Sequence, residues 1–221
     1  MNTQPAALRI DIVSDVVCPW CIIGFRRLQR AMDQVRDDVK FELRWHPFEL
    51  NPHMPPGGQN LGEHLNEKYA RSDEESRAAR DNLTELGASL GFTFNYSDDM
   101  RVANTFKAHQ LLHWASEQGA QTALELELFE AYFTHRQNVD DTEVLVDAVA
   151  RAGLDKAEAE AVLHDGRYRD TVREQEQHWL NRGIHAVPAF IIDEQYMISG
   201  AQESEVFVDA FQRLGEKVAL G

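Results

Sequence analysis

The pattern of apolar and polar positions changes twice within residues 8–45. Apolar and polar residues alternate along LRIDIV (8–13), the period of a β-strand. FELRW (41–45) alternates in the same way. Between them, apolar residues recur at steps of three and four, as on one face of a helix: Cys21, Phe25, Leu28, Met32 and Val35. The order strand, helix, strand predicts a βαβ unit with parallel strands.

The middle of the chain reads as helical. NPHMPPGG (51–58) contains three prolines and two glycines and ends the regular structure of the first part. From about residue 60 to residue 182 the spacing, the capping residues and the closing glycines predict a series of helices. They cover residues 61–90, 103–119, 122–137, 140–153, 155–164 and 167–182.

The end of the chain returns to strands. VPAFIID (187–193) and QYMIS (195–199) predict two strands joined by a tight turn at Asp193-Glu194, followed by a helix at about 203–217. The layout βαβ…ββα predicts an α/β protein with a four-stranded mixed sheet, interrupted by an α-helical insertion. We expect one discontinuous domain, 1–58 with 183–221, and a helical domain at 59–182.

Composition and charge narrow the possible partners. The chain has 221 residues, of which 22 are Lys or Arg and 37 are Asp or Glu, giving a net charge of −15. Such a chain repels phosphates and anionic lipids unless it carries a basic patch, and no basic run is present. We therefore expect no nucleic-acid or membrane partner. Because no long apolar segment or signal peptide is visible, we expect a cytoplasmic protein; the oligomeric state stays open.

The two cysteines, Cys18 and Cys21, both lie in one CPWC motif where the first strand gives way to the first helix. There Cys18 falls at the helix N-cap and Pro19 at the first helical position, where the missing N–H costs nothing. Free N–H groups and the helix dipole favour a Cys18 thiolate, with Cys21 one turn further on and more buried. The alternatives are packing cysteines or half of a zinc site. A structural zinc site needs four ligands, and no second Cys or Cys–His pair is present, so we expect no metal.

Several stretches together resemble a known family: SDVVCPWC (14–21), HPFELNPHMPPGG (46–58), GIHAVPAFIID (183–193) and SGAQ (199–202). They are similar to the DsbA-like thioredoxin-fold oxidoreductases, and within them to the FrnE-like branch. That branch is related to the 2-hydroxychromene-2-carboxylate isomerases and the kappa-class glutathione transferases. The resemblance covers essentially the whole chain and implies a thioredoxin fold split by an α-helical domain.

The resemblance also implies a role for Pro188. Members of the family place a cis-proline opposite the first cysteine, so the Val187 backbone would face the active site and pair with an extended peptide or glutathione. Spacing alone favours an ordinary trans-proline that opens an edge strand; the resemblance favours the cis-proline instead.

The chain departs from its relatives in three ways. The isomerase and transferase relatives carry Ser where Cys18 stands, the periplasmic DsbA proteins carry His where Trp20 stands, and some FrnE-like proteins have a further cysteine pair that is missing here. Keeping both cysteines favours dithiol–disulfide chemistry, and losing the His predicts a less oxidising couple.

Four further residues are weaker candidates. Asp15 could tune the protonation of the two thiols, or it could cap backbone N–H groups. Asn51 matches a glutathione contact of the kappa branch, although Asn before Pro is also turn chemistry. Asn104 and His109 resemble an NTxxAH pattern of the family and could line the cleft.

The remaining polar and aromatic candidates have simpler explanations. His109 and His113 have a zinc-binding spacing but no third ligand, and a hydrogen-bonded core histidine is the commoner outcome. We expect Trp20 to be partly exposed and to contact substrate, and Trp45, Trp114 and Trp179 to be core or cleft aromatics. The acidic run 72–81 reads as a solvated helix face.

These observations predict a thiol–disulfide oxidoreductase of the protein disulfide oxidoreductase or isomerase type. Cys18 would be the nucleophile, Cys21 the resolving thiol and Val187-Pro188 the docking element. No cofactor is required, and glutathione is a possible co-substrate; the partners would be disulfide-containing proteins or small thiols. Two alternatives stay open: a glutathione-dependent isomerase or transferase acting on a small aromatic substrate, and a non-catalytic chaperone.

Overall fold

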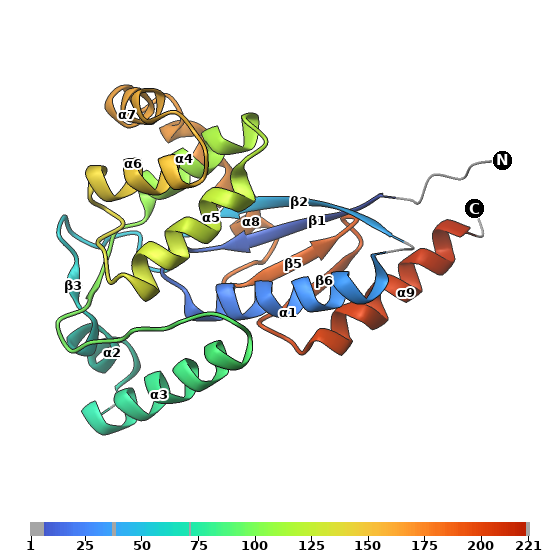
Figure 1. Ribbon diagram of the computed structural model, residues 1–221, viewed down its shortest axis with the longest axis horizontal. Helices are drawn as coiled ribbons and strands as arrows, with labels where there is room; N and C mark the ends of the chain where they lie inside the picture. Colours follow the sequence, from blue (N-terminus) through green and yellow to red (C-terminus); the bar gives the residue numbers. More distant parts are fainter. Residues whose placement is uncertain (1–6, 37–38, 71, 220–221) are drawn as a thin grey trace.

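A four-stranded mixed sheet organises the protein (Figure 1). The computed structural model describes residues 7–36, 39–70 and 72–219. The strands are β1 (Ala7–Ser14), β2 (Lys40–Pro47), β5 (Ala189–Ile192) and β6 (Tyr196–Ser199), in the order β2-β1-β5-β6. β1 and β2 are parallel, and β5 and β6 are antiparallel to their neighbours, as the βαβ…ββα pattern predicts.

Helices cover both faces of this sheet. On one face, α1 (Pro19–Val35) packs beside α9 (Ser204–Ala219) over Ile10, Ile12 and Phe190. On the other face, Trp179 of α8 (Arg169–Asn181) packs on Val13. Because β1 is the central strand and helices cover both faces of the sheet, side chains that point to either face need buried partners.

The helical block lies between β2 and β5 in the sequence. It contains α2 (Leu61–Tyr69), α3 (Asp73–Ser89), α4 (Phe106–Glu117), α5 (Gln121–Phe129), the π-helix η1 (Glu130–Thr134), α6 (Thr142–Arg151) and α7 (Lys156–Asp165), and it ends with α8. In Figure 1 α2 and α3 lie below the end of the sheet, α5 lies beside that end, and α4, α6 and α7 lie above it.

The structure differs from the predicted helices at three places. The expected helix 61–90 is two helices, because Ala70 adopts a left-handed conformation with φ of 50°. The helix expected from 103 begins only at Phe106. The stretch before it runs without a helix and forms β4 (Arg101–Val102), which pairs with β3 (Gln59–Asn60).

The end of the helix predicted at 122–137 changes its winding. Residues 130–134 form a π-turn, which adds one residue to the helical turn and brings two neighbouring aromatics, Tyr132 and Phe133, into the interior. Both are buried, at 3% and 2% exposure, and Tyr132 Oη donates a hydrogen bond of 3.1 Å to the Arg101 carbonyl.

One hydrophobic core runs through the sheet and the helical block. It joins Ile10 of β1 and Phe25 of α1 to Phe129 of α5 and Leu145 of α6. The division at 58/59 and 182/183 therefore stays a prediction.

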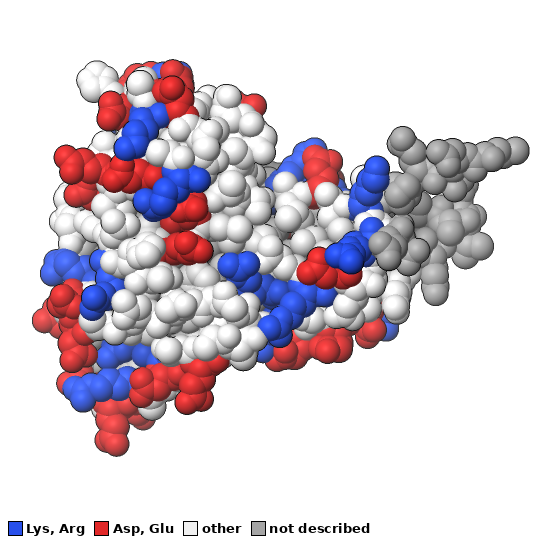
Figure 2. All heavy atoms as spheres, in the orientation of Figure 1, with Lys and Arg blue, Asp and Glu red and all other residues white. Residues whose placement is uncertain are grey.

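Charges are spread over the surface. On the face shown in Figure 2, basic and acidic side chains are intermixed, and acidic ones follow the lower edge where α3 and α9 lie. The predicted solvated face of 72–81 is present, since Asp73, Glu74 and Asp81 are exposed. None of the described helices is long and apolar enough to cross a membrane.

Candidate active site

Cys18 occupies the N-cap of α1, and Pro19 is the first residue of the helix. The backbone of Cys18 is extended, with φ of −93° and ψ of 112°, and the Cys18 N–H donates to the Asp15 carbonyl at 2.9 Å. The Cys18 side chain therefore stands at the positive end of the helix dipole, as the spacing predicts. Cys21, one turn on, is fully buried, and both cysteines are free thiols.

The surroundings of the Cys21 thiol shift its pKa in both directions. Burial raises the pKa of the Cys21 thiol well above its usual value, and the neighbouring Cys18 raises it further. Hydrogen bonding from the Asp15 backbone and from the Ser14 side chain works in the opposite direction. At neutral pH Cys21 is therefore a thiol that must lose a proton before it can attack.

The Val187-Pro188 peptide bond is cis, as the resemblance implies. Cys18 Sγ lies 3.8 Å from the Val187 carbonyl oxygen, so residues separated by 169 positions meet at one site. The SGAQ stretch supports this arrangement: Gly200 N–H donates to the Pro188 carbonyl at 2.8 Å, and Arg27 of α1 donates to the Ala201 carbonyl at 2.6 Å.

A cavity of about 660 Å³ opens beside Cys18. Its size is in the range of small-molecule sites. Cys18, Pro19, Trp20 and Val187 form the wall on the thioredoxin-like side. The opposite wall comes from the helical block and is mostly apolar: Leu61, Leu65, Leu83, Tyr96, Tyr132 and Phe133.

Polar side chains also line this cavity. Lys68 donates to Asn51 Oδ1 at 2.9 Å, and both residues line the cavity, as does Arg80. Asn51 therefore lies at the cavity beside Cys18, and its contact with glutathione stays a prediction. Trp20 is 46% exposed beside the cysteines, as predicted.

Asp15 is fully buried directly behind the CPWC motif. Its Oδ2 accepts a hydrogen bond from Leu50 N–H at 2.7 Å, so it caps a backbone group, and its Oδ1 lies 3.6 Å from His109 Nε2. Burial opposes a charge on His109, but Asp15, together with Glu125 and Glu176, outweighs it and raises the pKa of His109 to about 9. A buried ion pair thus lies between the β1 end and α4.

Two predicted cleft residues lie elsewhere. Asn104 does not line the cavity beside Cys18: its Oδ1 accepts from Phe106 N–H at 3.0 Å, and its Nδ2 donates to the Met54 carbonyl. These bonds fix the start of α4 to the 51–58 loop. His109 is buried behind the site and lines a second, smaller pocket, because its face of α4 packs toward β2.

The tryptophans of the core and the histidine pair are placed as the simpler explanations predict. Trp45, Trp114 and Trp179 are buried, at 4–5% exposure. His113 Nδ1 lies 3.2 Å from Gln175 Nε2, away from Asp15. The described residues hold no group of three or more His, Cys, Asp or Glu side chains able to bind a metal.

Three residues near the cysteines were not singled out from the sequence. Tyr96 lines the cavity, and burial together with Tyr132 and Cys18 raises its pKa. Glu49 is buried next to the cavity and is paired with Arg173. Glu125 is buried on α5. Of these three residues, only Glu125 has a sequence pattern that indicates burial, since it stands four residues before Phe129 on an apolar helical stripe.

Comparisons with known proteins agree with this geometry. Residues 9–212 match the family described as the DSBA-like thioredoxin domain. The probable DsbA oxidoreductase SCO1869 of Streptomyces coelicolor is 37% identical, with a TM-score of 0.87 over 95% of this chain and 91% of that one.

Two more distant structures share the fold. A 2-hydroxychromene-2-carboxylate isomerase is 15% identical, with a TM-score of 0.71 over 96% of this chain and 98% of that one. The cytosolic disulfide reductase DsbM of Pseudomonas aeruginosa, with GSH, is 16% identical, with a TM-score of 0.63 over 93% and 98%. A CPWC dithiol, a cis-proline facing it and a family match across nearly the whole chain lead to one conclusion: the protein belongs to the family of DsbA-like thioredoxin-fold oxidoreductases.

Proposed function

We propose that this protein is a thiol–disulfide oxidoreductase of the FrnE-like branch that works through the Cys18–Cys21 couple. The observation that carries the proposal is the meeting of Cys18 Sγ with the Val187 carbonyl, 3.8 Å apart, at the helix N-terminus and beside an open cavity. A helix N-terminus favours a thiolate, which is the attacking group in disulfide exchange. Cys18 is only 3% exposed, but it lines the cavity through which a substrate can reach it.

The reaction has two steps. The Cys18 thiolate attacks one sulfur of the substrate disulfide, which releases one substrate thiolate and leaves a mixed disulfide on Cys18. Cys21 then loses its proton and attacks Cys18 Sγ, which releases the second substrate thiolate and forms the Cys18–Cys21 disulfide. Two molecules of a thiol such as glutathione return the couple to the dithiol and leave as their own disulfide, and the same steps in reverse oxidise a substrate dithiol.

The residues around Cys18 have supporting roles in this proposal. The Val187 backbone docks the substrate next to the sulfur, and the exposed Trp20 contacts the part of the substrate that lies outside the cavity. Pro19 starts the helix without an N–H, and Asn51 orients a polar substrate group in the cavity.

The test is reduction of a disulfide-linked protein, followed by its precipitation, with glutathione supplied. Cys18→Ser should lose turnover. Cys21→Ser should keep the first step and accumulate a mixed disulfide that a reductant removes. Cys18→Ser with wild-type turnover would contradict the proposal.

A second candidate is a glutathione-dependent isomerase or transferase acting on a small aromatic substrate. The mostly apolar cavity of about 660 Å³ favours it, together with the fold shared with 2-hydroxychromene-2-carboxylate isomerase. It predicts that Cys18→Ser retains activity when glutathione supplies the sulfur. A chaperone role predicts that holding of unfolded clients is the same in both cysteine variants.

We also propose a cytoplasmic location and thiol or disulfide substrates, either proteins or small molecules. The reducing cytosol suits a chain with two free thiols and no disulfide framework. The structurally similar DsbM is described as a cytosolic disulfide reductase, and its structure holds GSH, which supports glutathione as the co-substrate.

A further inference from the structure

Two polar side chains of the cavity beside Cys18 have hydrogen-bonding capacity that the protein does not use. Arg80 of α3 and Tyr96, in the stretch between α3 and β4, both line this cavity. Among the described residues, neither the Arg80 guanidinium nor Tyr96 Oη has a hydrogen-bond partner. Buried polar groups are normally paired, so unpaired ones in a mostly apolar cavity indicate where a ligand binds.

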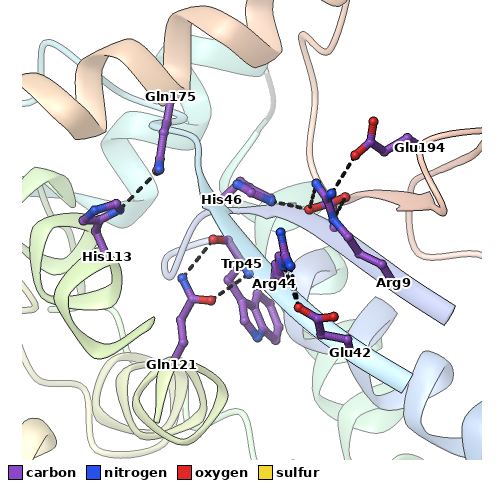
Figure 3. Close-up of polar contacts among 10 residues, drawn as sticks. Arg9, Glu42, Arg44, Trp45, His46, His113, Gln121, Gln175 and Glu194 are labelled. Atoms are coloured by element: carbon purple, nitrogen blue, oxygen red, sulfur yellow. Dashed lines mark hydrogen bonds and ion pairs between the residues drawn. The ribbon is translucent and has the colours of Figure 1, made fainter. Parts of the chain in front are cut away.

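The charge of Arg80 is only loosely neutralised by the protein. Its side chain is 12% exposed, and the carboxylate paired with it, that of Asp98, lies 3.5 Å away on a side chain that is 87% exposed. Arg9 shows a closer pairing: in Figure 3 it reaches Glu194, with 2.6 Å between Nη1 and Oε1. Removing a guanidinium from water costs free energy that close hydrogen bonds must offset, so Arg80 is suited to bind a further anion.

The Tyr96 hydroxyl can donate a hydrogen bond to the same anion. Aromatic contacts hold its ring, which is stacked on Phe94 at 5.6 Å between centroids and meets the edge of Phe133 at 6.2 Å. Burial raises the pKa of this hydroxyl, so it keeps its proton at neutral pH. Tyr96 therefore presents a donor in a fixed place on the cavity wall.

The charges that line the cavity also favour an anionic ligand. Glu49, the acidic residue in the described lining, is already paired with Arg173. The cations are Lys68 and Arg80, and Lys68 already donates to Asn51 and to a backbone carbonyl. Arg80 is therefore the lining cation that the protein engages least, and its guanidinium has five N–H donors.

The rest of the cavity suits an apolar body of small size. Leu61, Leu65, Leu83 and Phe133 line it, and burial of apolar surface against them stabilises a bound ligand. Cys18 is only 3% exposed, so a slender molecule reaches its sulfur more readily than a folded protein does. The ligand that fits all these groups has sulfur at one end, an apolar body and an anion at the other end.

We propose that the cavity binds a small apolar thiol or disulfide that ends in a carboxylate, with its sulfur at Cys18 and its carboxylate on Arg80 and Tyr96. This inference rests on the proposed function and names the substrate class of the same site. A planar guanidinium matches the two oxygens of a carboxylate, and the Tyr96 hydroxyl donates to one of them. Both residues determine specificity and take no part in the sulfur chemistry.

Dihydrolipoate is a probe with this chemistry, because it carries two thiols on an apolar chain that ends in a carboxylate. One of its thiolates attacks Cys18 Sγ in the oxidised protein, and Cys21 leaves as a thiolate and takes a proton from solvent. The second thiol of the probe loses its proton to solvent and attacks the probe sulfur bound to Cys18. The probe leaves as its cyclic disulfide, oxidised by two electrons, and the protein keeps both thiols.

Dihydrolipoamide is the matched probe, since it differs only by a neutral carboxamide in place of the carboxylate. Trapping the new protein thiols with a maleimide gives the rate constant for each probe. With the wild type, dihydrolipoate should react about 10- to 100-fold faster, the range expected for a hydrogen bond to a charged group. The net charge of −15 repels the anionic probe, so this preference requires a local cation.

Three variants locate the source of the preference. Arg80→Gln should bring the ratio of the two rate constants to about 1, while dihydrolipoamide keeps its wild-type rate. Tyr96→Phe keeps the ring and should lower the ratio about 3- to 10-fold, and it carries the test if Arg80→Gln does not fold. Arg77→Gln removes the same charge from an exposed position of α3 outside this cavity, and it should keep the wild-type ratio.

A neutral disulfide, 4,4′-dithiodipyridine, tests Cys18 without the carboxylate. Attack by the reduced protein releases a coloured thione, and its rate should be that of the wild type in all three variants. A wild type without preference for dihydrolipoate, or a preference that survives in both Arg80→Gln and Tyr96→Phe, overturns the carboxylate site while the proposed function stands. Loss of the preference in Arg77→Gln overturns it too, since the effect is then one of overall charge.

Two further outcomes are distinct from these. A preference that Tyr96→Phe leaves unchanged and Arg80→Gln abolishes removes Tyr96 from the site. If neither the dithiols nor 4,4′-dithiodipyridine reacts at Cys18 of the wild type, the proposed function itself is wrong, and the substrate class falls with it.

Discussion

His109 and Asp15 form a charged pair in the interior, next to the cysteines. Asp15 is fully buried and His109 is 3% exposed, with His109 Nε2 3.1 Å from the Phe48 carbonyl and 3.6 Å from Asp15 Oδ1. Burying two charges costs free energy that mutual attraction and hydrogen bonds must offset. Removing only one partner of such a pair lowers the free energy of unfolding strongly, because the other charge stays buried and unpaired. Replacing both partners by apolar residues is often nearly neutral.

The pair makes stability depend on pH. The folded protein holds the His109 proton more tightly than the unfolded chain, because Asp15, with Glu125 and Glu176, raises the pKa of His109 from 6.5 to about 9. The contribution of His109 to the free energy of unfolding, about 3 kcal/mol, should therefore be fully present below pH 6.5 and be lost as the pH rises through about 9. Urea unfolding at a series of pH values measures this.

Replacing His109 isolates its contribution to the pH dependence of the free energy of unfolding. His109→Gln should remove the loss of stability that His109 contributes between pH 6.5 and 9. The slope that Glu125 contributes from pH 4.5 upward should remain and extend to higher pH, because His109 no longer lowers the Glu125 pKa. His53→Gln, at an exposed position outside the cluster, should leave the profile unchanged. A wild-type profile that is flat above pH 6.5 would show that His109 is not charged in the folded protein.

At the scale of residues, the sequence predicted the placement of the CPWC motif better than the residues that surround it. The positions of Cys18, Pro19 and Cys21 followed from helix capping, a local rule. Glu125 and Tyr96 reach the site only through the packing of the helical block, which local spacing does not reveal. Asn104 was misplaced because its pattern marks the start of α4, where its side chain binds the backbone.

At the scale of elements, the first helix packs unusually close to the cis-proline loop. Gly24 lies on α1, one turn after Cys21, and a Cβ there would lie 3.0 Å from Phe190 Cζ, 3.2 Å from Pro188 Cγ and 3.3 Å from Ala201 Cα. The missing side chain therefore lets the helix that carries both cysteines approach the loop that carries Val187.

Adding a side chain at Gly24 should disturb both stability and the site. Gly24→Val should lower the free energy of unfolding by about 1–3 kcal/mol, because overpacking forces neighbours to move. Gly24→Ala should cost less, since Ala is better than Gly in a helix by about 1 kcal/mol. Both should slow mixed-disulfide formation at Cys18, because Pro188 is displaced; thermal unfolding and dithiodipyridine kinetics measure the two effects.

Gly62 provides the control for this series. It lies on α2, and a Cβ there would meet only the Asn60 side chain, at 3.3 Å. Gly62→Ala should therefore keep or raise the melting temperature and leave the kinetics unchanged. If Gly24→Val is as stable and as fast as the wild type, close packing at α1 has no role in the site.

Periodicity predicted the main elements well and their ends less well. β1, α1, β2 and the β5–β6 hairpin were predicted because their apolar faces repeat regularly, and Asp193 and Glu194 have the positive φ values, 50° and 58°, of a tight hairpin turn. The π-turn of η1 and the β3–β4 pair were missed. Both depend on contacts between segments, such as Tyr132 with the Arg101 carbonyl, that no local pattern records.

At the scale of the whole molecule, aromatic side chains tie the two parts of the chain together. Phe25 of α1 lies 4.8 Å from Trp45 of β2, measured between ring centroids, and Trp45 lies 6.4 Å from Phe129 of α5. Phe129 in turn lies 6.4 Å from Phe133, which lines the cavity beside Cys18. The sequence predicted the helical insertion but not this shared core, because the contacts join distant segments.

A shared core predicts that the helical block and the sheet unfold together. Phe129 is fully buried, so Phe129→Ala should lower the free energy of unfolding by about 3–5 kcal/mol. Far-UV circular dichroism follows the helices, and alkylation of the buried Cys21 follows the part of the chain around the sheet. In both wild type and variant the two probes should report one urea midpoint, lower in the variant, as for a two-state transition. If the helical signal is lost before Cys21 becomes reactive, residues 59–182 unfold as a separate unit, and the core is not shared in energetic terms.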